Sequence, residues 1–256
     1  MLSSAVLQAK PERGLKLGWT MKCSVGWCLR SWLAAVLVLT APCLAQPGHR
    51  KWPLIEDERA SRLQSMAQSM AVTYARPVEP INRVWICYWG GSGHPNRCSA
   101  DPGAYGEYTL FLDHKPGAYA FPGSVAHETF HLLNAHLIDA YMEGMCDCFS
   151  EDFCQANRFD WSRWPPYLEK QSPAYAHTYQ MMKAIRQVVG DNCFAGILAF
   201  AVATPGTRDD QHIDINAWLQ TIPLDKRSRV VQIIQSHASA IERYRLRNCH
   251  FELPRP

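Results

Sequence analysis

Apolar residues recur three or four positions apart over most of the chain, which is the spacing of amphipathic α-helices. Two short segments, 83–89 and 108–112, instead carry the bulky, alternating side chains typical of strands. The aromatic segment 158–167 is expected to be a loop that covers the core. Helices are predicted over residues 59–74, 125–133, 139–154, 175–189, 191–203 and 229–245. The pattern therefore predicts an α+β fold that is mainly α-helical and has a small sheet.

The N-terminal 45 residues are predicted to be a leader that is not part of this fold. Lys22 and Arg30 precede an apolar run that ends in small residues at Ala45. This order is typical of a signal peptide, with Met21 as the start and cleavage after Ala45. The apolar run is short for a membrane span, although a retained anchor is the alternative. We expect residues 46–256 to form a single exported domain, periplasmic or secreted, with no membrane span in the mature chain.

Removal of the leader changes the charge of the protein. Residues 1–45 hold five of the 26 basic residues and one of the 23 acidic residues. The mature chain would therefore carry 21 basic and 22 acidic residues, which gives a formal charge of −1 in place of +3. No block of Lys or Arg remains, so the charge pattern gives no support to a nucleic-acid partner.

The most informative segment of the chain is an H-E-x-x-H motif within the apolar helix predicted after Ser124. His127 and His131 are four residues apart, so on a helix they lie on one face and can offer two nitrogens to one ion. Glu128 lies beside them, where a carboxylate can accept a proton from water. This combination indicates a Zn²⁺ site with Glu128 as the general base.

A hydrolytic zinc site needs three protein ligands and one open position. Glu143 is the preferred third ligand because it falls on the helix predicted over 139–154, which can fold back onto the motif helix. Asp139 is the expected N-cap of that helix. His136 and Asp139 remain alternative third ligands.

The motif and its downstream segment resemble a known family. His127-Glu128-x-x-His131, followed by a Glu143-Gly144 pair, is similar to the gluzincin metallopeptidases, and more closely to the peptidase MA-like group. The resemblance covers residues 120–150 and implies a zincin-like domain with Glu143 as third ligand. It further implies that Asp147 hydrogen-bonds a ligand histidine, and that the strand at 108–112 is an edge that binds substrate by strand addition. Cys146 replaces the alanine that is usual in the family.

These residues imply an exported zinc metallopeptidase that acts on a peptide or protein substrate. The substrate oxyanion also needs a hydrogen-bond donor, for which His177, Tyr179 and His212 are the candidates. One alternative is a disulfide-stabilised zinc-binding module without turnover. Another is a zinc hydrolase that acts on a different amide, such as a cell-wall peptide cross-link.

Seven of the ten cysteines follow the leader, and an exported chain with this many is expected to contain disulfides. The expected pairs are Cys87 with Cys98 and Cys193 with Cys249. One thiol of the remaining three would then be unpaired. The alternative is a metal cluster formed by that group, which comprises Cys146, Cys148 and Cys154.

Overall fold

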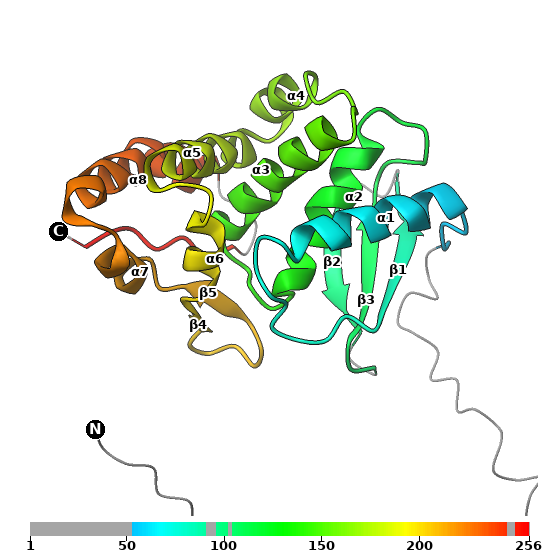
Figure 1. Cartoon of the computed structure of the whole chain (residues 1–256), viewed down its shortest axis with the longest axis horizontal. Helices are drawn as coiled ribbons and strands as arrows, with labels where there is room; N and C mark the ends of the chain where they lie inside the picture. The colour runs from blue at the N-terminus through cyan, green and yellow to red at the C-terminus, as the bar shows by residue number, and fades with distance from the viewer. Residues whose placement is uncertain (1–52, 91–95, 102–103, 245–248, 256) are drawn as a thin grey trace, which may run out of the picture. The chain divides into compact units, whose positions relative to one another are not determined.

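The computed structural model describes residues 53–90, 96–101, 104–244 and 249–255 (Figure 1). The expected leader, with its start at Met21 and its cleavage after Ala45, lies outside these residues. The described part is α+β and mainly helical, as the apolar pattern predicts. Its helices are α1 (Glu58–Ala71), α2 (Phe121–Phe130), the 3₁₀ helix η2 (His131–Leu133), α3 (Ala140–Ala156), α4 (Trp164–Gln171), α5 (Pro173–Val189), α6 (Cys193–Leu198), α7 (Ile215–Thr221) and α8 (Leu224–Tyr244).

The main sheet has three strands in the order β1-β3-β2, with β1 at Arg83–Tyr88, β2 at Arg97–Ala100 and β3 at Glu107–Leu112. β3 is parallel to β1 and antiparallel to β2. The expectation that the strand at 108–112 is a substrate-binding edge is therefore wrong, because β3 is paired on both sides. The edge strand that precedes the motif helix and runs antiparallel is β2. Its short sequence, Arg-Cys-Ser-Ala, contains few residues that favour strands, so the hydrophobic pattern does not reveal it.

Helix α2 carries the H-E-x-x-H motif and begins earlier than expected. It starts at Phe121, and Pro122 occupies the first turn, where proline costs no hydrogen bond. Ser124 is therefore inside the helix and is not its N-cap. Gly123 is explained by a close approach, since a Cβ there would lie 3.1 Å from the ring of Trp161. This packing fixes α2 against the segment before α4.

Helix α3 begins where the sequence predicts it. Asp139 is its N-cap, and the carboxylate accepts a hydrogen bond from the backbone N–H of Tyr141. Residues near the C-terminus of the described chain lie against this point. The backbone N–H of Ala140 donates to the carbonyl of His250 at 2.9 Å, and the Tyr141 hydroxyl donates to the carbonyl of Glu252 at 2.7 Å. Residues 249–253, the C-terminal strap, therefore hold the start of α3.

Two further segments differ from the prediction. The helix expected over 191–203 ends at Leu198, and residues Ala201–Ala203 form β4, which pairs with β5 (Gln211–Ile213). The aromatic segment expected to be a loop contains the start of α4, whose first turn holds Pro165 and Pro166. In both segments the tertiary contacts of Phe194, Trp161 and Trp164 in the core determine the backbone more than local propensity does.

The expected disulfides are not formed: all seven cysteines in the described part of the chain are free thiols. Cys87 on β1 is opposite Phe111 of β3, whereas Cys98 on β2 is opposite Leu110. Consecutive residues of a strand point to opposite faces, so the two thiols lie on opposite faces of the sheet with β3 between them. This arrangement exceeds the span of a disulfide.

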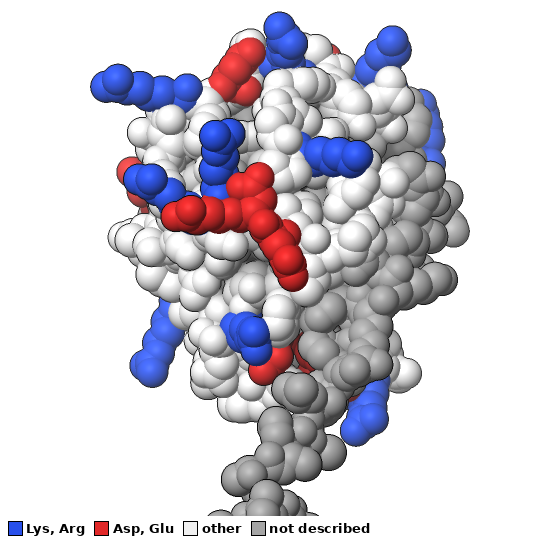
Figure 2. Space-filling model, turned by 90° about the vertical axis from the view of Figure 1, so that its right-hand side faces the viewer, with Lys and Arg blue, Asp and Glu red and all other residues white. Residues whose placement is uncertain are grey.

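Figure 2 shows one face of the molecule, on which Lys and Arg side chains are spread and acidic side chains lie among them. Within the described residues, no helix is both long enough and apolar enough to cross a membrane.

Candidate metal centre

The two histidines of the motif lie on one face of α2, at its end and at the start of η2. The ring centroids of His127 and His131 are 5.3 Å apart. His127 is 7% exposed, and His131 is partly buried. Helix α3 packs against α2, and brings Glu143 to the same place. The Oε2 atom of Glu143 lies 3.1 Å from Nε2 of His127 and 3.6 Å from Nε2 of His131.

These separations match the dimensions of a metal site. In a tetrahedral zinc centre with ligand distances of about 2.0–2.1 Å, two ligand atoms are about 3.3 Å apart. The separations of Glu143 from His127 and from His131 are therefore both close to the spacing of two ligands on a single ion.

Asp147 holds His127 in the orientation of a metal ligand. Asp147 lies one turn after Glu143 on α3, and its Oδ1 is 3.1 Å from Nδ1 of His127. A carboxylate can only accept, so Nδ1 donates to Asp147 and Nε2 is turned toward Glu143. A histidine that binds a metal ion commonly donates its other ring N–H to a carboxylate in this way. The contact between Nε2 and Glu143 can be bridged by a proton on the ring or by a metal ion in its place.

Asp147, which accepts from His127, is itself positioned by another hydrogen bond. It is fully buried, and the indole N–H of Trp164 donates to the same Oδ1 at 3.2 Å. Burial by itself lowers the pKa of His127. The charge and the hydrogen bond of Asp147, together with Glu143, outweigh burial and raise this pKa well above its ordinary value. The structure therefore places Asp147 where the resemblance implies.

Glu128 lies beside the histidines and is 2% exposed. Its Oε2 accepts no hydrogen bond from the residues that the structure describes. Burial raises the pKa of Glu128 to about 7, while the neighbouring histidines lower it. A carboxylate whose pKa lies near neutrality is suited to accept and return a proton.

The pKa of Glu143 is shifted in the opposite direction from that of Glu128. Burial alone would raise its pKa, but His131 and His127 outweigh this effect and hold the pKa well below its ordinary value. Glu143 is therefore ionised when it faces the histidines. With Glu128 and Asp147 it gives three acidic groups around two imidazoles, an arrangement that attracts a cation.

The alternative third ligands lie elsewhere. The carboxylate of Asp139 is occupied by the N–H groups of Tyr141 and Ile213. His136 is part-exposed and its Nε2 lies 3.5 Å from a carboxylate oxygen of Glu79. The geometry therefore favours Glu143 among the candidates from the sequence.

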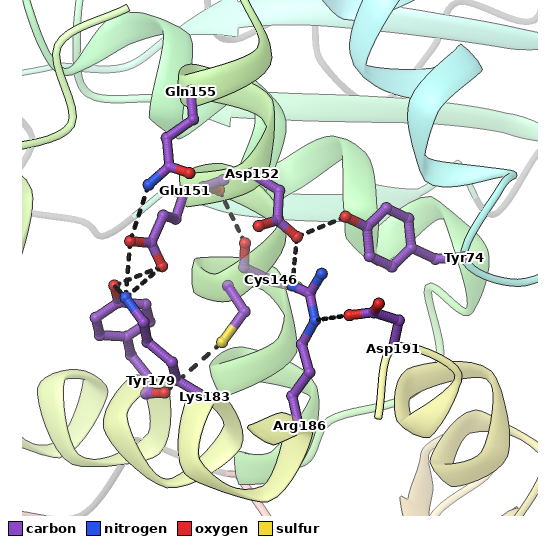
Figure 3. Close-up of polar contacts among 11 residues, drawn as sticks. Tyr74, Cys146, Glu151, Asp152, Gln155, Tyr179, Lys183, Arg186 and Asp191 are labelled. Atoms are coloured by element: carbon purple, nitrogen blue, oxygen red, sulfur yellow. Dashed lines mark hydrogen bonds and ion pairs between the residues drawn. The ribbon is translucent and has the colours of Figure 1, made fainter. Parts of the chain in front are cut away.

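The three oxyanion candidates make their recorded contacts away from the histidines. His177 on α5 hydrogen-bonds His237 of α8 at 3.2 Å, and His212 hydrogen-bonds Thr204 at 3.1 Å. Tyr179 donates to Glu151 at 2.8 Å, within the polar network that joins α3 to α5 in Figure 3. These contacts tie helices and strands together, and within the described part of the chain no hydrogen bond joins any of the three residues to His127, His131 or Glu128.

Tyr175 is the tyrosine that faces the centre. Its ring centroid lies 6.3 Å from that of His127, and it lines a cleft together with Glu128. The charge of Glu143 and burial raise its pKa well above the ordinary value, which keeps the hydroxyl protonated and able to donate. The sequence predicts a helix from this residue, but no local pattern shows that its first turn faces α2.

The cleft beside the motif has a volume of about 130 Å³. Its lining includes Trp164, Tyr167 and Leu168 of α4, together with His114 and Asn96. It opens next to Glu128 and His127, and it is large enough for one side chain of a substrate.

Cys146 also belongs to the centre. Its Sγ and one nitrogen each of His127 and His131 all lie within 4.8 Å of one another, which makes this trio a possible metal-binding group. The alternative cluster of Cys146, Cys148 and Cys154 is wrong, since the thiol of Cys148 donates to the carbonyl of Tyr179 on the opposite side of α3.

Comparison of the chain with protein-family models, curated proteins and solved structures finds no match. The site is therefore interpreted from its own geometry and from the resemblance of its motif.

Proposed function

We propose that this chain is an exported zinc-dependent metallopeptidase of gluzincin type. One observation carries the proposal: Oε2 of Glu143 lies 3.1 Å from Nε2 of His127 and 3.6 Å from Nε2 of His131. Glu128 lies beside this group with a buried oxygen that accepts no hydrogen bond from the described residues.

His127, His131 and Glu143 would hold the ion. When bound, zinc supplies Lewis acidity, which polarises a substrate carbonyl and lowers the pKa of water toward neutrality. Glu128 takes the proton as water attacks the peptide carbonyl, and then delivers it to the leaving amine. A pKa of about 7 suits both transfers.

Two other residues support this chemistry. Asp147 accepts the Nδ1 proton of His127, which fixes the tautomer and turns Nε2 toward the metal. Tyr175 is assigned to donate its hydroxyl hydrogen bond to the oxyanion of the tetrahedral intermediate. The motif alone does not identify the oxyanion donor, and Tyr175 is proposed for that role. Asp147 takes the role that the resemblance implies for it.

A peptide fits this site better than a compact small molecule. β2 is an edge strand, and an extended peptide can pair with such an edge through its backbone. The cleft next to Glu128 is lined by the aromatic residues Trp164 and Tyr167 and has room for a substrate side chain. We therefore assign the strand-addition role to β2.

The metal assignment is tested by zinc stoichiometry of the purified protein and of a Glu143→Ala variant. We expect one zinc per wild-type chain and much weaker binding in the variant. Equal zinc binding by both proteins would remove Glu143 from the ligand set. No zinc in the wild type, even after reconstitution, would refute the metallopeptidase.

The catalytic assignment is tested with Glu128→Gln on a peptide library. Zinc should remain bound while cleavage falls below detection, because the amide cannot take the proton. Glu169→Gln, at an exposed position of α4, is the matched control and should cleave normally. Zinc binding without cleavage by the wild type would favour the zinc-binding module, and cleavage only of cell-wall cross-links would favour the other amide hydrolase.

A further inference from the structure

Cys146 approaches the same histidines as Glu143. It lies three residues later on α3, on the same side of the helix, and is fully buried. Its Sγ and one nitrogen of each histidine lie within 4.8 Å of one another. Glu128 is adjacent to His127 in the chain, and its buried Oε2 has no hydrogen-bond partner among the described residues. With His127 of α2, His131 of η2 and Glu143 of α3, Cys146 brings the number of donors at the centre to four.

The distances are close to those of a thiolate ligand. With Zn–S of about 2.3 Å and Zn–N of about 2.0–2.1 Å, a nitrogen and a sulfur on one tetrahedral zinc are about 3.5 Å apart. The three atoms lie within 4.8 Å of one another, so they would have to approach one another by at most about 1.3 Å to bind one ion.

We propose that Cys146 is a fourth metal donor, and that its thiolate occupies the position that water needs for hydrolysis. This inference rests on the proposed function. A centre with four protein ligands is closed, whereas three ligands leave a position for water. The exchange of the thiolate for water therefore switches the protein between a latent and a hydrolytic form. Coordination releases the thiol proton to solvent, and no oxidant or reductant takes part.

The ligand assignment also predicts which ions the centre prefers. A thiolate is a soft donor and increases affinity for zinc and for softer ions relative to hard ions such as Mg²⁺. Two imidazoles and a carboxylate alone would give less selectivity. Cys146, unlike a small inert side chain, would therefore determine which ions the centre prefers.

Cobalt(II) is the probe that separates the two ligand sets. The purified full chain is treated with a chelator, dialysed and titrated with Co²⁺, and its absorption spectrum is recorded. We expect the visible bands of a tetrahedral site together with a near-ultraviolet thiolate-to-cobalt charge-transfer band. Cys146→Ser should lose only the charge-transfer band. Cys148→Ser, whose thiol contacts the carbonyl of Tyr179, is the matched control and should keep it.

Two further measurements follow from the same variants. Cys146→Ser should bind zinc more weakly in competition with a chelator, and should hydrolyse peptide faster per bound zinc. Cys249→Ser is a second control, because the thiol of Cys249 lies 3.9 Å from the other oxygen of Glu143. A charge-transfer band lost in Cys249→Ser and kept in Cys146→Ser would overturn the assignment of Cys146.

The outcomes separate this inference from the proposed function. Visible bands without a charge-transfer band in the wild type would refute Cys146 ligation and leave the three-ligand site intact. No binding of Co²⁺ by the wild type would refute both. Both of these refuting outcomes are read from the wild-type spectrum, so they do not depend on the folding of a variant, whereas the variants assign the band to Cys146 or to Cys249.

Discussion

Gly144 allows α3 to lie close against α5, and replacing it with alanine tests the packing that positions the centre. A Cβ at residue 144 would lie 2.4 Å from the carbonyl oxygen of Thr178 and 2.6 Å from Cγ of Met182. Ordinary contacts of a Cβ begin at 3.4 Å. The helices would have to separate by about 1 Å, because a backbone carbonyl within a helix cannot rotate away.

Two effects of opposite sign determine the magnitude. Alanine is favoured over glycine in a helix interior by about 1 kcal/mol. Overpacking of a tight interface costs about 1–3 kcal/mol, and contact with backbone belongs at the upper end of that range. We therefore expect Gly144→Ala to lower the free energy of unfolding by about 2 kcal/mol, which corresponds to a fall in Tm of about 4–8 °C for a domain of this size.

The assay is urea unfolding followed by far-ultraviolet circular dichroism, combined with zinc titration. Zinc affinity should also fall, since the proposed ligand Glu143 directly precedes the glycine. Gly196→Ala is the matched control, because its Cβ would meet only the Nε1 end of Trp218, at 3.3 Å. It should change the free energy of unfolding by less than about 1 kcal/mol. Stability of Gly144→Ala equal to or above that of the wild type would refute the close approach.

Three further predictions concern individual side chains. Asp147→Asn should weaken zinc binding by about 10–100-fold, because the His127 tautomer is no longer fixed by a carboxylate, and a competition titration that gives unchanged affinity would contradict this role. Tyr175→Phe should lower kcat by about 10²–10³-fold while zinc affinity is unchanged; equal kcat values would remove the hydroxyl from the mechanism. Burial, and then the neighbouring His177, lower the pKa of His237, so the unfolded chain binds a proton more readily and stability is lost as pH falls through about 6.5. His237→Gln should therefore lose less stability than the wild type between about pH 7.5 and about pH 5.5, measured by urea midpoints, and an identical loss would show that this histidine does not contribute.

The parts of the fold that follow from local periodicity could be predicted from the sequence. The stripes of apolar residues locate α1, α3, α5 and α8 to within a few residues. The carboxylate of Asp139 marks the start of α3 correctly, since an N-cap depends only on its own backbone neighbours. These features need no knowledge of distant contacts.

The parts that depend on distant contacts could not be predicted. β2 is stabilised by pairing with β3 and not by its own composition, so the sequence pointed to the wrong strand as the edge. The direction of Tyr175 depends on how α5 crosses α3, which Gly144 determines 31 positions earlier in the chain. The pairing of cysteines depended on an assumed proximity of Cys87 and Cys98, which the order of the strands excludes.

The C-terminal strap has a consequence for the timing of biosynthesis. All residues proposed to hold the metal or to transfer protons lie between positions 127 and 175, and α2 and α3 are made early. The strap residue Cys249 reaches Glu143 across 106 positions, and His250 and Glu252 hold the first turn of the helix that carries this carboxylate. These contacts can form only after the strap has left the ribosome, so a nascent chain that already contains the whole motif still lacks this support for the helix that carries Glu143.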